Sequence, residues 1–211
     1  LFRSISNDAA FGAGSSTANA LLLDGVDTRD PEGGTDWTFF NYNIIDQVQI
    51  QGLGAPAEYG SYTGAVVNTV SKSGTNRYGA LFDLNYSRGS WASDNVPAEV
   101  SAANPALSEP AVTNKYLDVT AQLSGPIKRD KAFFFFSAQR FLKDEDPTGP
   151  RTTREEISHR ANLKLNFNPG PNDQLVAALQ FDDYNIRGRC DLDSEFLCRD
   201  DSGEQSNGPL A

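Results

Sequence analysis

The sequence predicts a mainly β protein, in which a small mixed α/β domain precedes antiparallel strands of a transmembrane β-barrel that is incomplete within this chain. Three observations support this prediction. Apolar and polar residues alternate in several stretches after residue 76, as expected of strands with two different faces. The 18 glycines and 11 prolines among 211 residues indicate frequent turns. The alternating stretches are separated by connections that are long and short in turn.

The first 75 residues contain three short apolar runs separated by loop residues. Residues 20–28 (ALLLDGVDT) predict a short buried strand that ends in an Asp-Gly turn. Residues 43–52 and 64–76 predict a second and a third strand. None of these runs has a long helical period, so we expect a small, mixed and loop-rich domain.

From Tyr78 onward the apolar residues recur with a period of two, which places them on one face of each strand. The alternating stretches are residues 78–86, 116–124, 161–167 and 175–183. Residues 132–142 (AFFFFSAQRFL) also predict a strand, but their composition does not assign its two faces.

The connections between these strands favour a membrane barrel over a soluble β-sandwich. Residues 125–131 and 168–173 form short connections, whereas long ones are expected after Ser87, Leu142 and Asp183. Outer-membrane barrels have short periplasmic turns, longer outer loops and aromatic residues at strand ends. A sandwich also alternates, but it gives no reason for long loops to gather at one end. A soluble, secreted β-rich binding or adhesion module remains the alternative function.

Two segments resemble a known family. Residues 21–28, followed by residues 44–90, are similar to the junction between plug and barrel in TonB-dependent outer-membrane receptors. They are most similar to the Oar-like receptors, which carry a carboxypeptidase-regulatory-like domain before the plug. Residues 123–140 (LSGPIKRDKAFFFFSAQR) resemble the second and third barrel strands of that subfamily. The resemblance spans roughly residues 20–187, and the run from Ala55 to Asn76 is its most specific part.

The resemblance implies a plug domain in residues 1–75 and the first strands, about five, of a large plugged barrel in residues 76–211. Such receptors lie in the bacterial outer membrane and import bulky ligands. The implied partners are outer-membrane lipid and the TonB complex, which acts through an N-terminal segment that these residues lack. The ligand, a siderophore, oligosaccharide, peptide or protein, is not identified by the sequence.

The glycine-rich residues 52–57 (GLGAPA) fit a permissive dinucleotide-binding pattern, but the surrounding residues do not support a cofactor site. That site needs a helix after the glycines and an acidic residue about 20 positions further on. Pro56 and Gly60 interrupt the following segment, and residues 71–73 are Ser-Lys-Ser. We therefore expect no cofactor, and we interpret the glycines as room for the chain to turn.

Two pairs of residues are candidates for specific contacts. Glu58 and Tyr59 are candidates for a contact between plug and barrel, in which Glu58 binds an arginine or lysine of the barrel wall. The alternative for Glu58 is a solvated loop acid. Cys190 and Cys198 lie close together in an acidic loop, and their spacing permits a disulfide in an oxidising compartment. The alternative is two free thiols.

Composition and spacing argue against several other functions. The formal net charge of -10 is opposite to the basic face that nucleic acids require. An acidic surface loop is favoured over a calcium site at residues 191–201, because Phe196 occupies the position of the calcium-loop glycine. His159 is the only histidine, and we expect it at a strand end. With no second histidine, no Cys-His cluster and no Ser-His-Asp set, zinc and hydrolase chemistry lack necessary groups. The adjacent acids Asp182–Asp183 and Glu155–Glu156 face opposite ways in a strand, which does not suit acid-base catalysis at one point. We therefore predict neither a metal site nor an enzyme.

Overall fold

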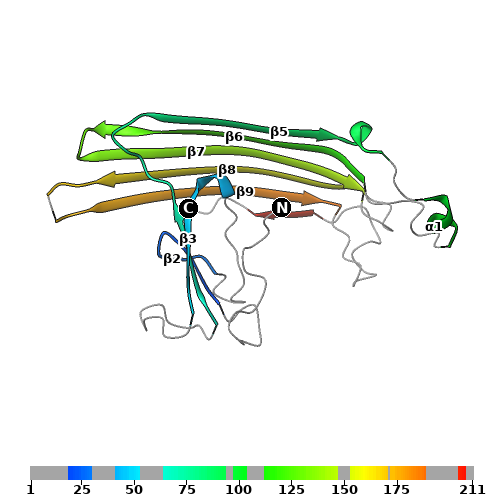
Figure 1. The fold of residues 1–211 in the computed structure, drawn as a ribbon, viewed down its shortest axis with the longest axis horizontal. Helices are drawn as coiled ribbons and strands as arrows, with labels where there is room; N and C mark the ends of the chain where they lie inside the picture. The colour runs from blue at the N-terminus through cyan, green and yellow to red at the C-terminus, as the bar shows by residue number, and fades with distance from the viewer. Residues whose placement is uncertain are drawn as a thin grey trace. The chain divides into compact units, whose positions relative to one another are not determined.

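The computed structural model describes residues 19–29, 41–52, 64–93, 97–103, 112–146, 153–170, 172–188 and 204–207. The chain divides into two compact units, Leu1–Gly74 and Thr75–Ala211. Each unit contains one sheet (Figure 1). The predicted mainly β fold is confirmed.

The first unit contains a four-stranded mixed sheet in the order β2-β1-β4-β3. Its strands are β1 (Ala20–Leu23), β2 (Val26–Asp27), β3 (Ile45–Gln51) and β4 (Val66–Ser71), and the 3-10 turn Tyr42–Ile44 leads into β3. β1 and β4 are parallel, whereas the other pairs are antiparallel. All four residues of β1 are buried, which explains why this strand is a continuous apolar run and does not alternate.

The Asp-Gly turn predicted after β1 is present. Asp24 has a φ of 50° and Gly25 a φ of 84°, the left-handed conformation that a tight two-residue hairpin requires and that Asp-Gly adopts readily. The Asp24 carboxylate accepts hydrogen bonds from the backbone N–H of Ser71, at 3.0 Å, and from its hydroxyl. The Gly25 N–H donates to Asn68 Oδ1 at 3.0 Å. The turn is therefore attached to β4 as well as to its own strands.

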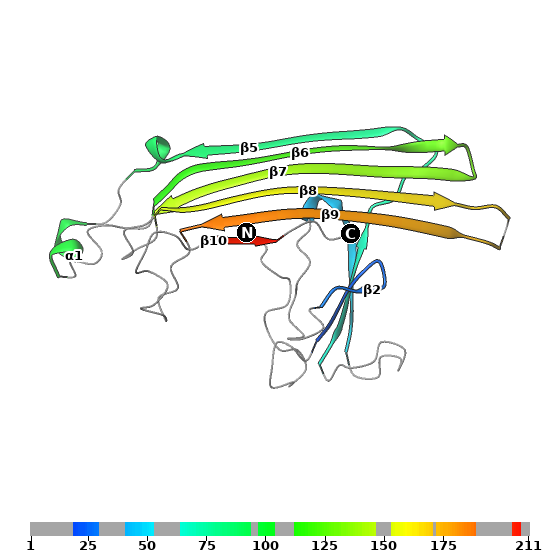
Figure 2. The same ribbon diagram turned by 180° about the vertical axis from the view of Figure 1, so that it is seen from behind.

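The second unit contains a six-stranded antiparallel sheet whose strands are in chain order, from β5 at one edge to β10 at the other (Figure 2). These strands are β5 (Gly79–Arg88), β6 (Val112–Lys128), β7 (Ala132–Asp146), β8 (Arg154–Phe167), β9 (Leu175–Arg187) and β10 (Glu204–Asn207). The 3-10 turn Gly89–Trp91 and the short helix α1 (Ala98–Ala103) follow β5. No helix in the described parts of the chain is long and apolar enough to cross a membrane.

The strands are longer than the alternating stretches of the sequence. The expected short connections are confirmed, with residues 129–131 between β6 and β7 and residues 168–174 between β8 and β9. The long charged loop expected after Leu142 is wrong, because Asp144 pairs with Glu155 and only residues 147–153 separate the two strands. Charged residues there suggested a loop, but backbone hydrogen bonds continue the ladder whatever the side chains are.

The sequence also missed β10, which pairs with the end of β9. Its four residues, Glu-Gln-Ser-Asn, contain no apolar side chain. Without an apolar face there was no alternation from which to recognise this strand.

Candidate functional site

Strand pairing assigns the residues of β5 to β9 to two faces, because directly opposite residues of an antiparallel ladder share a face. One of them, which we call the apolar face, continues across all five strands. Phe82 is 71% exposed and Leu179 68%. A contiguous exposed patch of this kind marks a surface that is covered by something other than water. Its members are Ala80, Phe82, Leu84, Tyr86, Leu117, Val119, Ala121, Leu123, Phe134, Phe136, Ala138, Ala161, Leu163, Leu165, Phe167, Leu175, Ala177, Leu179 and Phe181.

A charged row lies beside the apolar residues on the same face, toward the end of the sheet where β7 meets β8. It consists of Arg140, His159 and Asp183, which are directly opposite one another on three neighbouring strands. His159 Nδ1 lies 3.7 Å from Asp183 Oδ2. The expectation that His159 ends a strand is wrong, because β8 begins at Arg154, several residues earlier than the alternation showed.

The opposite face, which we call the polar face, carries amides, hydroxyls and charges. Most of these side chains are buried, and Thr120, Ser137 and Asp182 are each at most 2% exposed. Burial of such groups is costly unless they are hydrogen-bonded. The central members of the polar face are Asp118, Thr120, Gln122, Ser137, Gln139, Arg160, Asn162, Gln180 and Asp182.

A hydrogen-bonded row, which we call the polar ladder, crosses four strands of this face. Gln139 Nε2 donates to Asp118 Oδ1 at 2.8 Å, and Arg160 Nη1 donates to Gln139 Oε1 at 3.2 Å. Arg160 Nε also donates to Asp182 Oδ1 at 3.3 Å, which completes an ion pair between β8 and β9. The cation Arg160 therefore lies between Gln139 on one side and Asp182 on the other. Its ion pair compensates part of the free-energy cost of burying the carboxylate of Asp182.

A second hydrogen-bonded row lies one step along the strands. Gln122 Nε2 donates to Ser137 Oγ at 3.4 Å, and Asn162 Nδ2 donates to Gln180 Oε1 at 2.9 Å. The two rows repeat the same chemistry on adjacent levels, so the polar character belongs to the whole face. A sheet that is apolar on one side and polar on the other has the properties of a wall between lipid and a polar interior.

β7 shows why the sequence could not assign its faces. Phe134 and Phe136 lie on the apolar face, whereas Phe135 lies on the polar face and is only 3% exposed. Both faces of this strand are therefore aromatic over part of its length. Only the pairing with β6 and β8 distinguishes them.

The acidic pairs do separate as expected. Asp182 belongs to the polar ladder, whereas its neighbour Asp183 lies beside His159 on the other face. Among the described residues, no group of three or more His, Cys, Asp or Glu side chains could hold a metal ion. The two carboxylates therefore cannot act together on one substrate atom.

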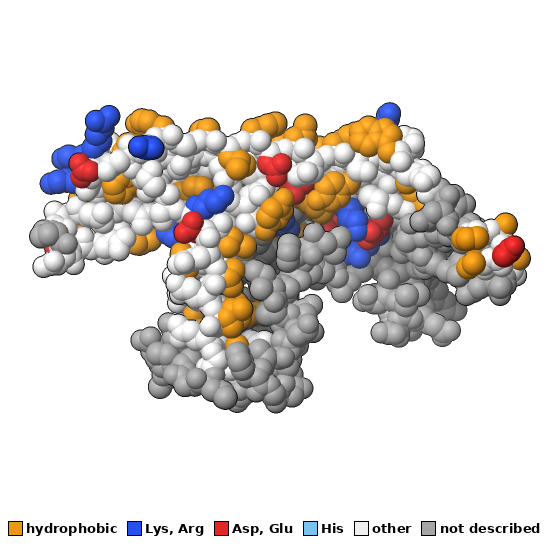
Figure 3. Space-filling model, in the orientation of Figure 1, with side chains coloured by type: hydrophobic (Ala, Val, Ile, Leu, Met, Phe, Trp, Pro, Cys, Tyr) orange, Lys and Arg blue, Asp and Glu red, His pale blue; other side chains and the backbone are white. Residues whose placement is uncertain are grey.

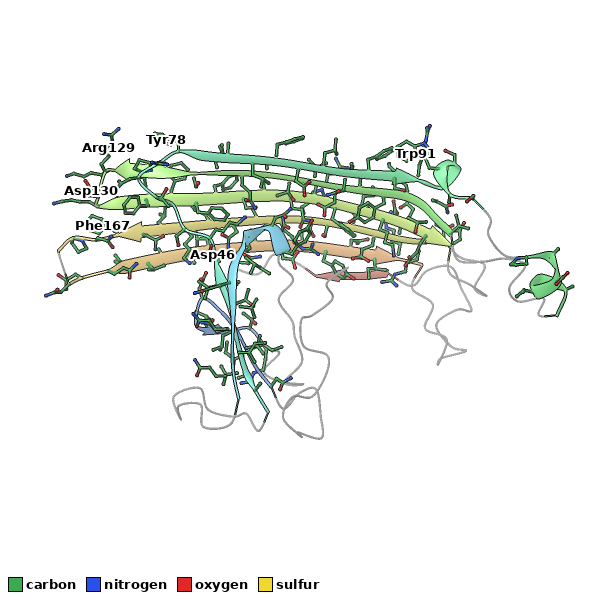
Figure 4. All side chains as sticks on the ribbon, viewed as in Figure 1. Asp46, Tyr78, Trp91, Arg129, Asp130 and Phe167 are labelled. Carbon is green, nitrogen blue, oxygen red and sulfur yellow. The ribbon has the colours of Figure 1, made fainter. Side chains whose placement is uncertain are left out.

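Aromatic side chains lie at both ends of the sheet, where Tyr78 and Trp91 mark opposite ends of β5 (Figure 4). The rings of Tyr86 and Trp91 meet edge to face with centroids 5.6 Å apart. The guanidinium carbon of Arg88 lies 5.2 Å from the centre of the Trp91 ring. This grouping of aromatic and basic side chains is typical of the boundary between lipid and water.

The first unit holds a close ion pair beside β2. Arg29 Nη2 lies 2.6 Å from Asp27 Oδ2, and Arg29 Nε donates to Asp27 Oδ1 at 3.0 Å. The hydrogen bonds from the Arg29 guanidinium hold the pKa of the Asp27 carboxyl below its usual range, although partial burial acts in the opposite direction. The same contact raises the pKa of Arg29, which stays protonated.

The four candidate contact residues of the sequence, Glu58, Tyr59, Cys190 and Cys198, lie outside the described residues. The plug contact and the disulfide stay predictions. The sequence in turn missed the polar ladder, although its period-two pattern contained the signal. Gln139, Arg160 and Asp182 stand at polar positions of three successive strands, but only the register places them in one row.

Comparison with known proteins identifies the class. No protein-family model matches the chain. The chain is 28% identical over 120 residues to the TonB-dependent transporter Oar of Myxococcus xanthus. The match covers 57% of this chain and 11% of that protein, so the chain spans only a small part of its relative.

A solved structure shares the fold of most of the chain. The siderophore receptor PirA from Acinetobacter baumannii superposes with a TM-score of 0.57 and 14% identity, over 82% of this chain and 24% of that chain. The outer membrane transporter YddB from Escherichia coli gives a TM-score of 0.43 and 12% identity, over 96% and 36% of the two chains.

The chain is thus a partial homologue of a TonB-dependent transporter. The homologue is a TonB-dependent transporter, not an enzyme. This confirms the predicted resemblance, the outer-membrane location and the non-enzymatic class. The homology supports outer-membrane transport in general.

Proposed function

We propose that this chain belongs to a receptor for TonB-dependent uptake of a bulky ligand across the bacterial outer membrane. In this proposal residues 1–75 are part of the plug and residues 76–211 supply the first strands of the barrel wall. The observation that carries the proposal is the two-faced sheet of the second unit, supported by homology to a TonB-dependent transporter over 120 residues.

The apolar face supports contact with lipid. Its exposed side chains include Phe82 and Leu84 on β5, Leu123 on β6 and Leu179 on β9. In water each of these side chains would lose the free energy that burial provides, whereas hydrocarbon solvates them well. A soluble binding module would need a further layer of structure to cover this face.

The polar face supports a wet interior that can hold a plug and release it. Side-chain hydrogen bonds on this face can be exchanged for hydrogen bonds to water at a small net free-energy change. A plug held by such contacts can be displaced by mechanical force from the TonB complex without any bond chemistry. We propose Glu58 as one plug contact, paired with a barrel-wall arginine or lysine, and Tyr59 as its neighbour in the same loop.

Detergent dependence tests the membrane assignment against the soluble alternative. We expect the full-length protein to sediment with outer membranes and to aggregate when detergent is removed. A full-length protein that stays monodisperse in water without detergent would overturn the proposal. Dependence on TonB is tested separately, because ligand uptake should stop in cells that lack TonB while ligand binding to the cells persists.

The proposed plug contact has its own test. Glu58→Gln in the full-length receptor should lower the force or denaturant concentration at which the plug leaves the barrel, since the charge that pairs with the wall is lost. Single-molecule pulling on the plug measures this directly. Unchanged release would show that Glu58 is a solvated loop residue. The ligand stays open between a siderophore, an oligosaccharide, a peptide and a protein.

A further inference from the structure

Four basic side chains gather at the end of the sheet where β6 turns into β7. Lys128, Arg129 and Lys131 lie in and beside this turn, and Arg77 lies two residues before the start of β5 at Gly79; all four are exposed. We call them the basic cluster. Lys and Arg side chains are concentrated at this end of the second unit, with an acidic group among them (Figure 3).

Asp130, the acidic residue within the cluster, is hydrogen-bonded to Asn76. Asn76 Nδ2 donates to Asp130 Oδ1 at 2.6 Å, and the backbone N–H of Asp130 donates to Asn76 Oδ1 at 2.9 Å. This reciprocal pair holds the segment before β5 against the turn and so keeps Arg77 beside the other three cations. Among the residues that the structure describes, no member of the basic cluster forms an ion pair.

The cluster adjoins the apolar face directly. Along the start of β5 the chain passes from Arg77 to Tyr78, which is 77% exposed, and then to Phe82, which is 71% exposed. On β6 the exposed Ile127 immediately precedes Lys128. Cation, aromatic ring and hydrocarbon therefore follow one another in the order of the layers of a bilayer, from phosphate through the interface to the acyl chains.

The positive charge is local. The other short connection, residues 168–174, contains no lysine or arginine and carries Asp173, and the whole chain has a formal net charge of -10. A general excess of basic residues does not explain the cluster. Its exposure, its sign and its position beside Tyr78 fit an anionic partner that lies at the level of the lipid head groups.

We propose that the basic cluster binds the phosphate groups of anionic phospholipids in the leaflet next to the short turns. This inference rests on the proposed function, which places the apolar face in the bilayer. A lipid surface fits better than a soluble acidic protein, because the apolar residues that adjoin the cations continue without a break into the membrane-facing side chains.

Lipid selectivity of the full-length receptor tests the proposal. The protein is placed in phosphatidylcholine vesicles that contain spin-labelled phosphatidylglycerol or spin-labelled phosphatidylcholine, and the motionally restricted fraction of each label is compared. We expect the lipid positions that bind most tightly to prefer phosphatidylglycerol over phosphatidylcholine on the order of tenfold. This preference should fall as the salt concentration is raised. The variant Arg77→Gln/Lys128→Gln/Arg129→Gln/Lys131→Gln should lose this selectivity.

A matched control keeps the charge and changes the side chains. The variant Lys128→Arg/Arg129→Lys/Lys131→Arg should retain the selectivity, and Arg129→Gln alone should lose part of it even if the quadruple variant does not fold. Equal restriction of the two lipids by the wild-type receptor would overturn the inference. So would displacement of the lipid by millimolar inorganic phosphate, since the site would then serve a free anion. In both cases a receptor that still inserts into the vesicles leaves the proposed function standing, whereas failure to insert overturns that function.

Discussion

The ring of Tyr78 lies over Gly125 on the neighbouring strand. A Cβ atom on Gly125 would stand 2.3 Å from Tyr78 Cδ1, closer than any real contact, and the Tyr78 hydroxyl donates to the carbonyl of Pro126 at 3.2 Å. The ring thus covers backbone that a side chain would otherwise shield. An aromatic residue across from a glycine stabilises a strand pair in this way.

Gly125→Ala should therefore destabilise the protein. The added methyl group forces the Tyr78 ring off the strand and removes its hydrogen bond to Pro126. We expect the free energy of unfolding to fall by about 1–3 kcal/mol, the usual cost of overpacking, as measured by urea unfolding of the full-length receptor in lipid vesicles.

Two further variants separate this contact from a general effect of replacing glycine. At Gly89 the nearest atom to an added Cβ is 3.4 Å away, so Gly89→Ala should change the stability by less than about 0.5 kcal/mol. In the double variant Tyr78→Ala/Gly125→Ala the clash is absent. The two substitutions should then be less costly together than the sum of their separate effects, and strict additivity would contradict the contact.

Leu84 and Asn85 test the assignment of the two faces, because they are neighbours on β5 that belong to opposite faces. Leu84 is 55% exposed on the apolar face, and Leu84→Arg would place a charge in hydrocarbon. We expect a clear loss of stability in vesicles, since arginine on the lipid side of a barrel costs up to about 2–4 kcal/mol at the middle of the wall and less toward its edges. Asn85→Arg, at the same depth on the polar face, should cost less than about 1 kcal/mol. Equal losses would show that the faces are assigned wrongly.

How far the sequence predicts this structure depends on whether an element has one apolar face. β5, β6 and β9 were predicted because their alternation is strict, and the Asp24–Gly25 turn because its left-handed backbone has a specific residue signature. β10, the last four residues of β7 and the first seven of β8 were missed, since nearly all of their side chains are polar. Backbone pairing in these segments depends on their neighbours, and a single segment does not show it.

The polar ladder depends on the register in which the strands pair, and one sequence does not show that register. Gln139, Arg160 and Asp182 were visible as polar positions, but a slip of one residue would move each of them to the apolar face. Only the pairing of β7, β8 and β9 brings them into one row. The polar ladder is therefore visible only in the structure, whereas the family resemblance is visible in the sequence.

Breaking the polar ladder should cost more than breaking the exposed pair on the opposite face. Arg160→Gln leaves the carboxylate of Asp182, which is 2% exposed, without its cation. We expect the free energy of unfolding to fall by about 2–4 kcal/mol, since an unpaired buried charge is strongly destabilising. His159→Gln serves as the control, because His159 and Asp183 are both 48% exposed, and it should cost less than about 0.5 kcal/mol. Urea unfolding in vesicles measures both variants.

A double variant shows whether the loss comes from the unpaired charge. Arg160→Met/Asp182→Leu removes both charges and leaves apolar side chains of similar volume. It should recover a large part of the stability lost in Arg160→Gln. A double variant that is as unstable as the sum of its two single variants would mean that the two residues act independently.

Asp27 and Arg29 predict an acid-sensitive contribution to the stability of the first unit. Hydrogen bonds from Arg29 lower the pKa of Asp27 in the folded protein below the value of 3.8 that it has when unpaired. A lowered pKa means that the folded state holds the carboxylate more strongly than the unfolded state. The contribution is therefore complete above about pH 5 and is lost as the pH falls through the folded pKa. Arg29 stays charged throughout this range because its own pKa is raised.

Asp27→Asn should remove this acid dependence. The difference in unfolding free energy between the wild type and Asp27→Asn should be constant between about pH 5 and 7 and should shrink toward zero below about pH 4. It should be small, because half of the Asp27 side chain is open to solvent. Urea unfolding of the full-length protein at each pH measures it, and Asp46→Asn, an exposed position of the same sheet, controls for the change of net charge. A difference that instead grows on acidification would mean that Arg29 does not stabilise the carboxylate.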